Sequence, residues 1–184
     1  MRKKWLITAG LVAMLAILLA GCASSQNTGR PVLRDKTYGE IMNEKLISFT
    51  DCADDFCGIL DEVAEKDSAP SDSQVGRLSD SLGRLEIAGA ALKGVKAPSA
   101  YAAAQSAMDR AMDDYAAAFE KGRALLDFYR GYDERFHAYK DPAEGRKEIR
   151  VQEKALYEDF ASAMARASDS FRQACEELDN VKTE

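Results

Sequence analysis

The chain has 184 residues, of which 25 are Lys or Arg, 31 are Asp or Glu and one is His. A hydrophobic content of 46% excludes wholesale disorder, and a formal net charge of −6 without a concentrated basic stripe is unfavourable for binding nucleic acid. The single His excludes multi-histidine metal sites and most histidine-dependent catalysis.

The first 21 residues have the pattern of an export signal. Met1-Arg-Lys-Lys4 is a positively charged start, and residues 5–20 are an uncharged apolar run, shorter than the ~20 residues that a membrane-spanning helix needs. The run ends in Leu19-Ala20-Gly21-Cys22. This motif resembles the lipobox of bacterial lipoproteins, in which a Leu and two small residues precede an obligatory Cys.

The resemblance implies that a diacylglyceryl group is attached to the Cys22 thiol, that a peptidase cuts between Gly21 and Cys22, and that a fatty acid such as palmitate is often added to the new amino terminus. Two or three acyl chains anchor a protein stably to a membrane. Because Ala23 rather than Asp follows the Cys, the resemblance implies the outer membrane where the host has one, and otherwise the outer face of the cytoplasmic membrane. An uncleaved signal anchor is the alternative interpretation.

The mature chain is predicted to consist of a tether and one domain. Residues 22–36 carry Ser, Asn, Gly and Pro without periodicity, which is typical of a flexible linker behind the lipidated terminus. Residues 37–184 form the predicted domain. Removal of residues 1–21 takes away three basic groups, which leaves 22 basic and 31 acidic groups and a net charge of −9.

Two capping boxes predict the starts of the first two helices. Thr37-Tyr-Gly-Glu40 and Ser71-Asp-Ser-Gln74 each place a hydroxyl three residues before a Glu or Gln that can reach back. Apolar residues then recur every three or four positions, which predicts helices of about 25 to 30 residues. The two predicted core stripes are Met42, Leu46, Phe49, Ala53, Phe56, Leu60, Val63 and Val75, Leu78, Leu82, Leu85, Gly89, Leu92.

Two longer helices follow in the sequence. Pro98 fits the first turn of the third, and Asp141-Pro-Ala-Glu144 supplies a cap and a first-turn Pro for the fourth. Each is predicted to have about 40 residues, or ~60 Å. Their stripes are Tyr101, Gln105, Met108, Met112, Tyr115, Phe119, Gly122, Leu126, Tyr129 and Tyr157, Phe160, Met164, Ala167, Phe171, Ala174, Leu178, Val181.

The predicted fold class is all-α, because no stretch alternates in the manner of a strand. Short connections favour an up-down-up-down antiparallel four-helix bundle. Helices three and four are longer than the others, so they should protrude as a hairpin arm with its end near residues 140–146. Gly131 lies inside this arm and either bends it or ends the third helix, in which case the arm folds back.

Three thiols remain once Cys22 carries lipid, in a compartment where disulfides persist. Cys52 and Cys57 are too far apart in an unbroken helix to bridge each other. Cys52 with Cys175 is the favoured pair, because both fall at similar heights if helices one and four start from a common base. Cys57 with Cys175 is the alternative, because both follow a core position, and three unbridged thiols are the third possibility.

The arm is predicted to carry the binding surface. Residues 121–154 hold nine basic and seven acidic groups, a net of +2, whereas the rest of the mature chain has a net of −11. Arg and Tyr are enriched at binding hot spots. In the alternative interpretation the aromatic residues only build a small core and the charges only solvate it. The candidate binding residues are Arg130, Tyr132, Arg135, Phe136 and Arg150.

No catalytic motif was found in the sequence. Glu134-Arg-Phe-His137 matches one element of a di-iron bundle, but such a site needs this element twice and the chain has one His. We therefore expect a non-enzymatic envelope lipoprotein with no cofactor, held to the membrane at Cys22, that binds an envelope protein or an anionic polymer. A small-ligand or metal carrier and a purely structural spacer are the alternatives.

Overall fold

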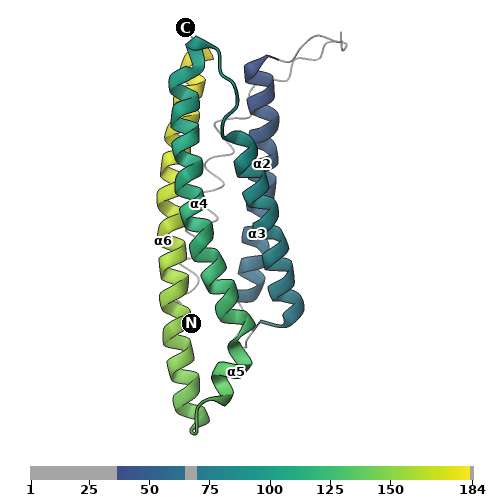
Figure 1. The fold of residues 1–184 in the computed structure, drawn as a ribbon, viewed down its shortest axis with the longest axis vertical. Helices are drawn as coiled ribbons and strands as arrows, with labels where there is room; N and C mark the ends of the chain where they lie inside the picture. The colour runs from purple at the N-terminus through teal and green to yellow at the C-terminus, as the bar shows by residue number, and fades with distance from the viewer. Residues whose placement is uncertain (1–36, 65–69, 183–184) are drawn as a thin grey trace.

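The structure is a computed structural model that describes residues 37–64 and 70–182. Every regular element in these ranges is helical, which confirms the predicted all-α class. Figure 1 shows the long helices lying lengthwise beside one another in an elongated molecule. Labelled as in that figure, the elements are α2 (Tyr38–Ala64), α3 (Asp72–Leu92), the 3-10 turn η1 (Ser99–Tyr101), α4 (Ala102–Arg130), α5 (Tyr132–His137) and α6 (Pro142–Lys182).

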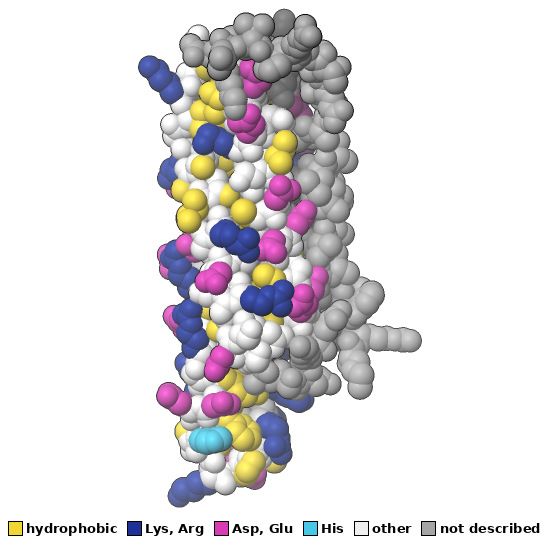
Figure 2. All heavy atoms as spheres, turned by 90° about the vertical axis from the view of Figure 1, so that its right-hand side faces the viewer, with side chains coloured by type: hydrophobic (Ala, Val, Ile, Leu, Met, Phe, Trp, Pro, Cys, Tyr) yellow, Lys and Arg dark blue, Asp and Glu magenta, His cyan; other side chains and the backbone are white. Residues whose placement is uncertain are grey.

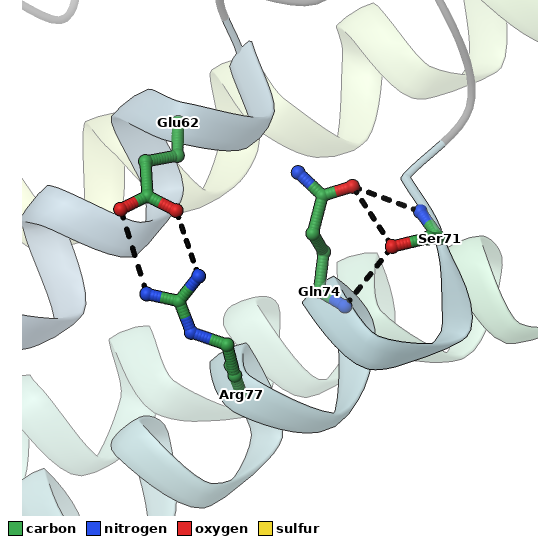
Figure 3. Close-up of polar contacts among 4 residues, drawn as sticks. All are labelled: Glu62, Ser71, Gln74 and Arg77. Carbon is green, nitrogen blue, oxygen red and sulfur yellow. Dashed lines mark hydrogen bonds and ion pairs between the residues drawn. The ribbon is translucent and has the colours of Figure 1, made fainter.

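Both predicted capping boxes are formed. The Thr37 hydroxyl accepts from the Glu40 amide at 3.3 Å, and the Glu40 carboxylate accepts from the Thr37 amide at 2.7 Å. At the start of α3, Ser71 and Gln74 exchange the same two bonds at 3.3 and 3.0 Å (Figure 3). Each box satisfies amide groups that the first turn of a helix leaves without an internal partner, and so fixes where the helix begins.

Polar contacts identify the neighbouring segments of α2 and α3. Arg77 in the second turn of α3 binds Glu62 near the end of α2 at 2.8 Å (Figure 3). One turn later, the fully buried Ser81 hydroxyl donates to Asp55 at 2.9 Å. Rising residue numbers on α3 are therefore paired with falling numbers on α2.

The same reversal relates α4 to α6. The Tyr115 hydroxyl lies 3.1 Å from the Ser168 hydroxyl, and the Tyr129 hydroxyl donates to Glu153 at 3.2 Å. Burial is the main cause that raises the pKa of Tyr115 to about 12, and its bond to Ser168 opposes that shift. A rise of 14 residues on α4 thus matches a fall of 15 on α6, so the two helices stay in contact over most of their length.

The predicted stripes form the core. All positions of the first two stripes are buried, and the largest fully buried side chains include Tyr115, Phe49 and Phe160. Only the end positions of the two longer stripes, Tyr101, Tyr157 and Val181, are partly exposed. Apolar residues at helical spacing therefore predicted the buried face of each long helix correctly.

The size of the side chains sets the spacing between the helices. Small residues such as Ala111, Ala118 and Ala167 are fully buried and let α4 approach α6 closely. Between α2 and α6, in contrast, no Cα atom of one helix lies within 8 Å of a Cα atom of the other. Aromatic rings fill this wider interval, where the ring centroids of Phe49 and Phe171 are 5.3 Å apart and those of Phe56 and Phe160 are 5.9 Å apart.

The third helix is shorter than predicted. The chain departs from α-helix at Gly131 (φ −95°, ψ 15°), so α4 has 29 residues and α5 follows as a separate helix of six residues. The prediction of about 40 continuous residues was wrong. Gly131 ends the helix, as the alternative expected, but the arm does not fold back, because α5 continues beyond the ends of α2 and α3 (Figure 1). Pro98 was also expected in the first turn of the third helix, but it precedes the turn η1, which separates it from α4.

The fourth helix agrees with its prediction. α6 has 41 residues and begins at Pro142, and the Asp141 carboxylate accepts from the Ala143 amide at 2.7 Å. Together, α5 and the first turns of α6 extend beyond the ends of α2 and α3 in Figure 1. The predicted export signal, the lipidation residue Cys22 and the tether lie outside the described residues.

Candidate functional site

The tip, defined here as residues 131–150, is the candidate site that the sequence predicted within the arm. It consists of Gly131, α5, the turn at 138–141 and the first turns of α6. Of the described elements, α5 contacts only α4 and α6. The tip is therefore held by the α4–α6 side of the molecule alone, without support from α2 or α3.

Aromatic residues hold α5 against the end of α4. The ring of Tyr132 meets that of Phe128 edge-on at 6.3 Å, and the Arg135 guanidinium lies 5.2 Å from the centre of the Phe128 ring. Phe128 is buried, whereas Tyr132 and Phe136 are partly exposed. Figure 2 shows hydrophobic side chains gathered at this end of the molecule around His137, the one histidine. The tip thus presents an aromatic surface that is only partly covered.

A close contact joins the two sides of the tip. A Cβ atom on Gly145 would lie 2.9 Å from Cβ and Cγ of Tyr139, so the first turns of α6 approach the turn through a position that only Gly fits without a shift. Ile149, one turn later, is fully buried. Ile149 belongs to the continuous core of the molecule, and Tyr132, Phe136 and Tyr139 pack against that core at its end.

The positive charge of the predicted arm does not belong to the tip. The net of +2 for residues 121–154 comes from residues 121–130, which have three basic groups and one acidic group, whereas residues 131–154 hold six of each. Arg123 binds Glu86 of α3 at 2.6 Å, and Arg130 donates to Ser79 of α3 at 2.9 Å. The candidate residue Arg130 is thus attached to the body, and the prediction that it belongs to the protruding part was wrong.

One strip of the tip nevertheless carries cations without partners. Arg146, Lys147 and the candidate residue Arg150 are exposed on α6 and make no ion pair with any other described residue. Burial raises the pKa of the Tyr132 hydroxyl, the carboxylate of Glu153 raises it further, and the charges of Arg150 and Arg146 oppose the shift. The structure thereby brings Tyr132 and Arg150 near each other, as the predicted site requires.

Neither predicted disulfide is formed. Cys52 and Cys57 lie on α2 and Cys175 lies on α6, and the two backbones are more than 8 Å apart, whereas a disulfide needs Cα atoms within ~7 Å. The assumed common base was also wrong. Because Phe49 meets Phe171, Cys175 lies beyond the level of Phe49 in the direction away from Cys52 and Cys57.

The more buried of the two thiols on α2, that of Cys57, is also unreactive. Burial first, and nearby carboxylates second, raise the pKa of Cys57 to about 12. The thiolate is the reactive form of cysteine, so Cys57 remains almost wholly unreactive at neutral pH. Cys52 is partly exposed and is therefore the more accessible of these two thiols.

A polar cluster at the opposite end was not predicted as a site. Tyr38 donates to the Gln105 side chain at 2.7 Å, and the Gln105 amide donates to the Leu92 carbonyl at 3.1 Å and to Asp109 at 2.6 Å. Asp109 also accepts from the amide of Gly94, whose φ of +70° favours Gly. The signal in the sequence was a Gln within an otherwise apolar stripe.

Comparisons with known proteins assign no function to this geometry. No protein family, curated protein or solved structure matches the chain. Among residues 37–64 and 70–182, no group of three or more His, Cys, Asp or Glu could hold a metal ion. In the same ranges, no helix combines the length and the apolar character needed to cross a membrane.

Proposed function

We propose that this chain is a bacterial envelope lipoprotein, held to a membrane by acyl chains on Cys22, whose helical domain binds a partner through the tip. The resemblance of residues 19–22 to a lipobox supports the anchor. Ala23 supports the outer membrane as the destination where the host has one. The partner is an envelope protein or an anionic polymer.

The proposed topology of the domain is an up-down-up-down antiparallel four-helix bundle whose longer helices carry the tip as an arm. The reversed pairing of residue numbers between α2 and α3, and between α4 and α6, supports it. Aromatic contacts from α2 to α6 support a closed bundle rather than two separate hairpins.

One observation carries the proposed role of the tip. The first turn of α2, where the tether would arrive, and the tip lie at opposite ends of the molecule in Figure 1. The 41 residues of α6 correspond to ~60 Å at 1.5 Å per residue. A chain anchored before residue 37 would therefore present Tyr132, Phe136 and the unpaired Arg150 far from its anchor.

The anchor is tested by metabolic labelling with palmitate. We expect wild-type protein to incorporate the label and Cys22→Ala to lose it, because the thiol is the proposed attachment point. Cys52→Ala is the matched control and should keep the label. Label that persists on Cys22→Ala would contradict the proposed lipoprotein.

The role of the tip is tested by photo-crosslinking in the intact envelope. A photoreactive amino acid replaces Phe136 or Lys147 in the tip, and Arg110 or Arg166 on the exposed body in matched controls. We expect a discrete adduct only from the tip positions, and Arg150→Glu should remove it if the partner is anionic. Adducts from body positions alone, or from none, would favour the carrier or the spacer.

A further inference from the structure

The seam between α4 and α6 holds α2 in the body of the molecule. The ring of Phe49 on α2 meets that of Tyr115 on α4 at 5.1 Å and that of Phe171 on α6 at 5.3 Å. Near the end of α2, burial first and the Asp61 carboxylate second raise the pKa of Tyr157 on α6 to about 12. α2 therefore lies over the seam from the level of Phe171 to that of Tyr157.

The same side of α6 continues into the tip. On α6, Phe171 and Tyr157 are residues that face α2. Steps of three or four residues keep to one side of a helix, and from there they lead to Glu153, Arg150 and Arg146. α2 ends soon after this level, whereas α6 continues past it (Figure 1). The side of α6 that α2 covers in the body is therefore left without α2 in the tip.

This part of the seam and the aromatic residues of α5 form a shelf, defined here as Tyr132, Phe136, Arg146 and Arg150. Burial is the main cause that raises the pKa of the Tyr132 hydroxyl, and the charges of Arg150 and Arg146 oppose the shift, so both lie near it. Figure 2, viewed from the side on which α2 and α3 lie in Figure 1, shows hydrophobic side chains at this end. Along α6 the shelf extends from residue 142 to residue 157, or ~22 Å, which accommodates about four turns of a helix.

The two edges of the shelf differ in charge. Arg146 and Arg150 on α6 are exposed, make no ion pair with any other described residue, and lie one turn or ~6 Å apart. Glu153, the acid on this side of α6, already accepts from the Tyr129 hydroxyl at 3.2 Å. On α5, in contrast, the exposed residue beside Tyr132 is Asp133. A partner therefore needs acids along the α6 edge and not along the α5 edge.

We propose that the shelf binds an acidic amphipathic helix of another envelope protein, which lies over the continued seam in line with α2. Its aliphatic side chains would cover Tyr132 and Phe136, and two acids one turn apart on one edge would pair with Arg146 and Arg150. A helix laid in an apolar groove is a common mode of recognition, and α2 occupies the same seam in this way. The inference rests on the proposed role of the tip and gives the chemistry of its partner.

Other occupants suit the shelf less well. Glu148 is two residues from both Arg146 and Arg150, so it lies on nearly the opposite side of α6. A membrane surface or a uniformly anionic polymer that surrounded the tip would meet both signs of charge, and a polymer brings no apolar groups to the aromatic rings. The chain's own residues 22–36 hold three basic groups and one acidic group, which is the wrong sign.

The test is a titration of a fluorescent peptide with the full chain in nanodiscs of neutral lipid, followed by fluorescence anisotropy. The probe is an amphipathic helix of about 15 residues, with Leu on one face, Glu at every fourth position along one edge, and Gln elsewhere. We expect saturable binding with a dissociation constant below about 100 μM, and at least tenfold weaker binding of polyglutamate and of anionic vesicles. Equal binding of polyglutamate or of the vesicles, or no saturation by up to about 1 mM probe, would overturn the proposal.

Charge reversal separates the shelf from general electrostatics. Arg150→Glu should weaken binding of the probe about tenfold or more, because it removes a cation and adds an acid at the pairing edge. Arg166→Glu makes the same change at an exposed position of α6 in the body and should bind as wild type. The double variant R146E/R150E should prefer a probe in which Lys replaces Glu. Equal losses from Arg150→Glu and Arg166→Glu, or no such preference, would overturn the assignment.

Photo-crosslinking in the envelope distinguishes this inference from the proposed role of the tip. A tip adduct at position 136 together with no binding of the helical probe would overturn the helix as occupant and leave the role of the tip intact. Absence of any adduct from the tip would overturn both.

Discussion

The two ends of the molecule are stabilised in different ways. At the end where α2 begins, Tyr38, Gln105 and Asp109 connect α2, α3 and α4 through hydrogen bonds that are largely buried. At the tip, α5 contacts only α4 and α6 and has aromatic residues that are partly exposed. Polar networks whose members are all satisfied make a segment rigid, whereas low contact density allows local opening. We therefore expect the first end to be rigid and the tip to open locally.

The largest expected difference lies between the middle of the core and its end at the tip. The side chains of Phe160 and Ile149 are almost completely buried, with 1% and 0% of their surface exposed. Phe160→Ala should lower the free energy of unfolding by about 3–5 kcal/mol, the usual range for a core Phe. Ile149→Ala should lower it by less than the ~2–5 kcal/mol typical of a buried Ile, because the tip can open while the body stays folded.

Urea denaturation followed by circular dichroism measures both variants. Val151→Ala is the control for Ile149→Ala, because Val151 is 57% exposed on the same helix and should change little. A loss from Ile149→Ala as large as that from Phe160→Ala would show that the tip and the body unfold as one unit.

The polar end should respond to the loss of a single side chain. Gln105→Ala leaves the Tyr38 hydroxyl and the Leu92 carbonyl without their partner, which should cost about 1–3 kcal/mol. Thermal and urea unfolding measure the loss. Gln152→Ala, at a partly exposed position of α6, is the matched control and should be nearly neutral. Equal effects would mean that the network does not fix this end.

The periodic features of the fold could be predicted from sequence because they are local. Apolar residues three and four positions apart must share a face of a helix, and a hydroxyl three residues before Glu or Gln caps it. The start of α6 at Pro142 follows in the same way from Asp141 and the Pro itself. These features depend on neighbours within one turn.

The predictions that were wrong depended on how the helices are placed relative to one another. The predicted disulfides depended on the axial offset of α2 and α6, which the packing of Phe49 against Phe171 sets and no local pattern reveals. The charge of the arm depended on where α4 ends, and Gly131 alone leaves both a bend and a stop open.

A pair of Gly substitutions should have smaller effects on stability that differ between the two sites. Gly76 lies inside α3 with open space where its Cβ would be, so Gly76→Ala should stabilise the protein by about 0.5–1 kcal/mol. Gly145→Ala gains the same helix propensity but places its Cβ 2.9 Å from Tyr139. It should leave global stability nearly unchanged and loosen the tip, seen as faster amide exchange at residues 132–148. Stabilisation by both variants would show that Tyr139 moves away at little cost.

Hydrogen–deuterium exchange of the wild-type domain, read by mass spectrometry, tests the central difference most directly. We expect peptides that cover residues 131–150 to exchange well before those that cover residues 42–63, 104–126 and 160–178, because only the tip opens without the rest. A bound partner should slow exchange at the tip alone. Uniformly slow exchange from residue 131 to residue 178 would contradict the account, because the tip would then be as closed as the end held by Gln105.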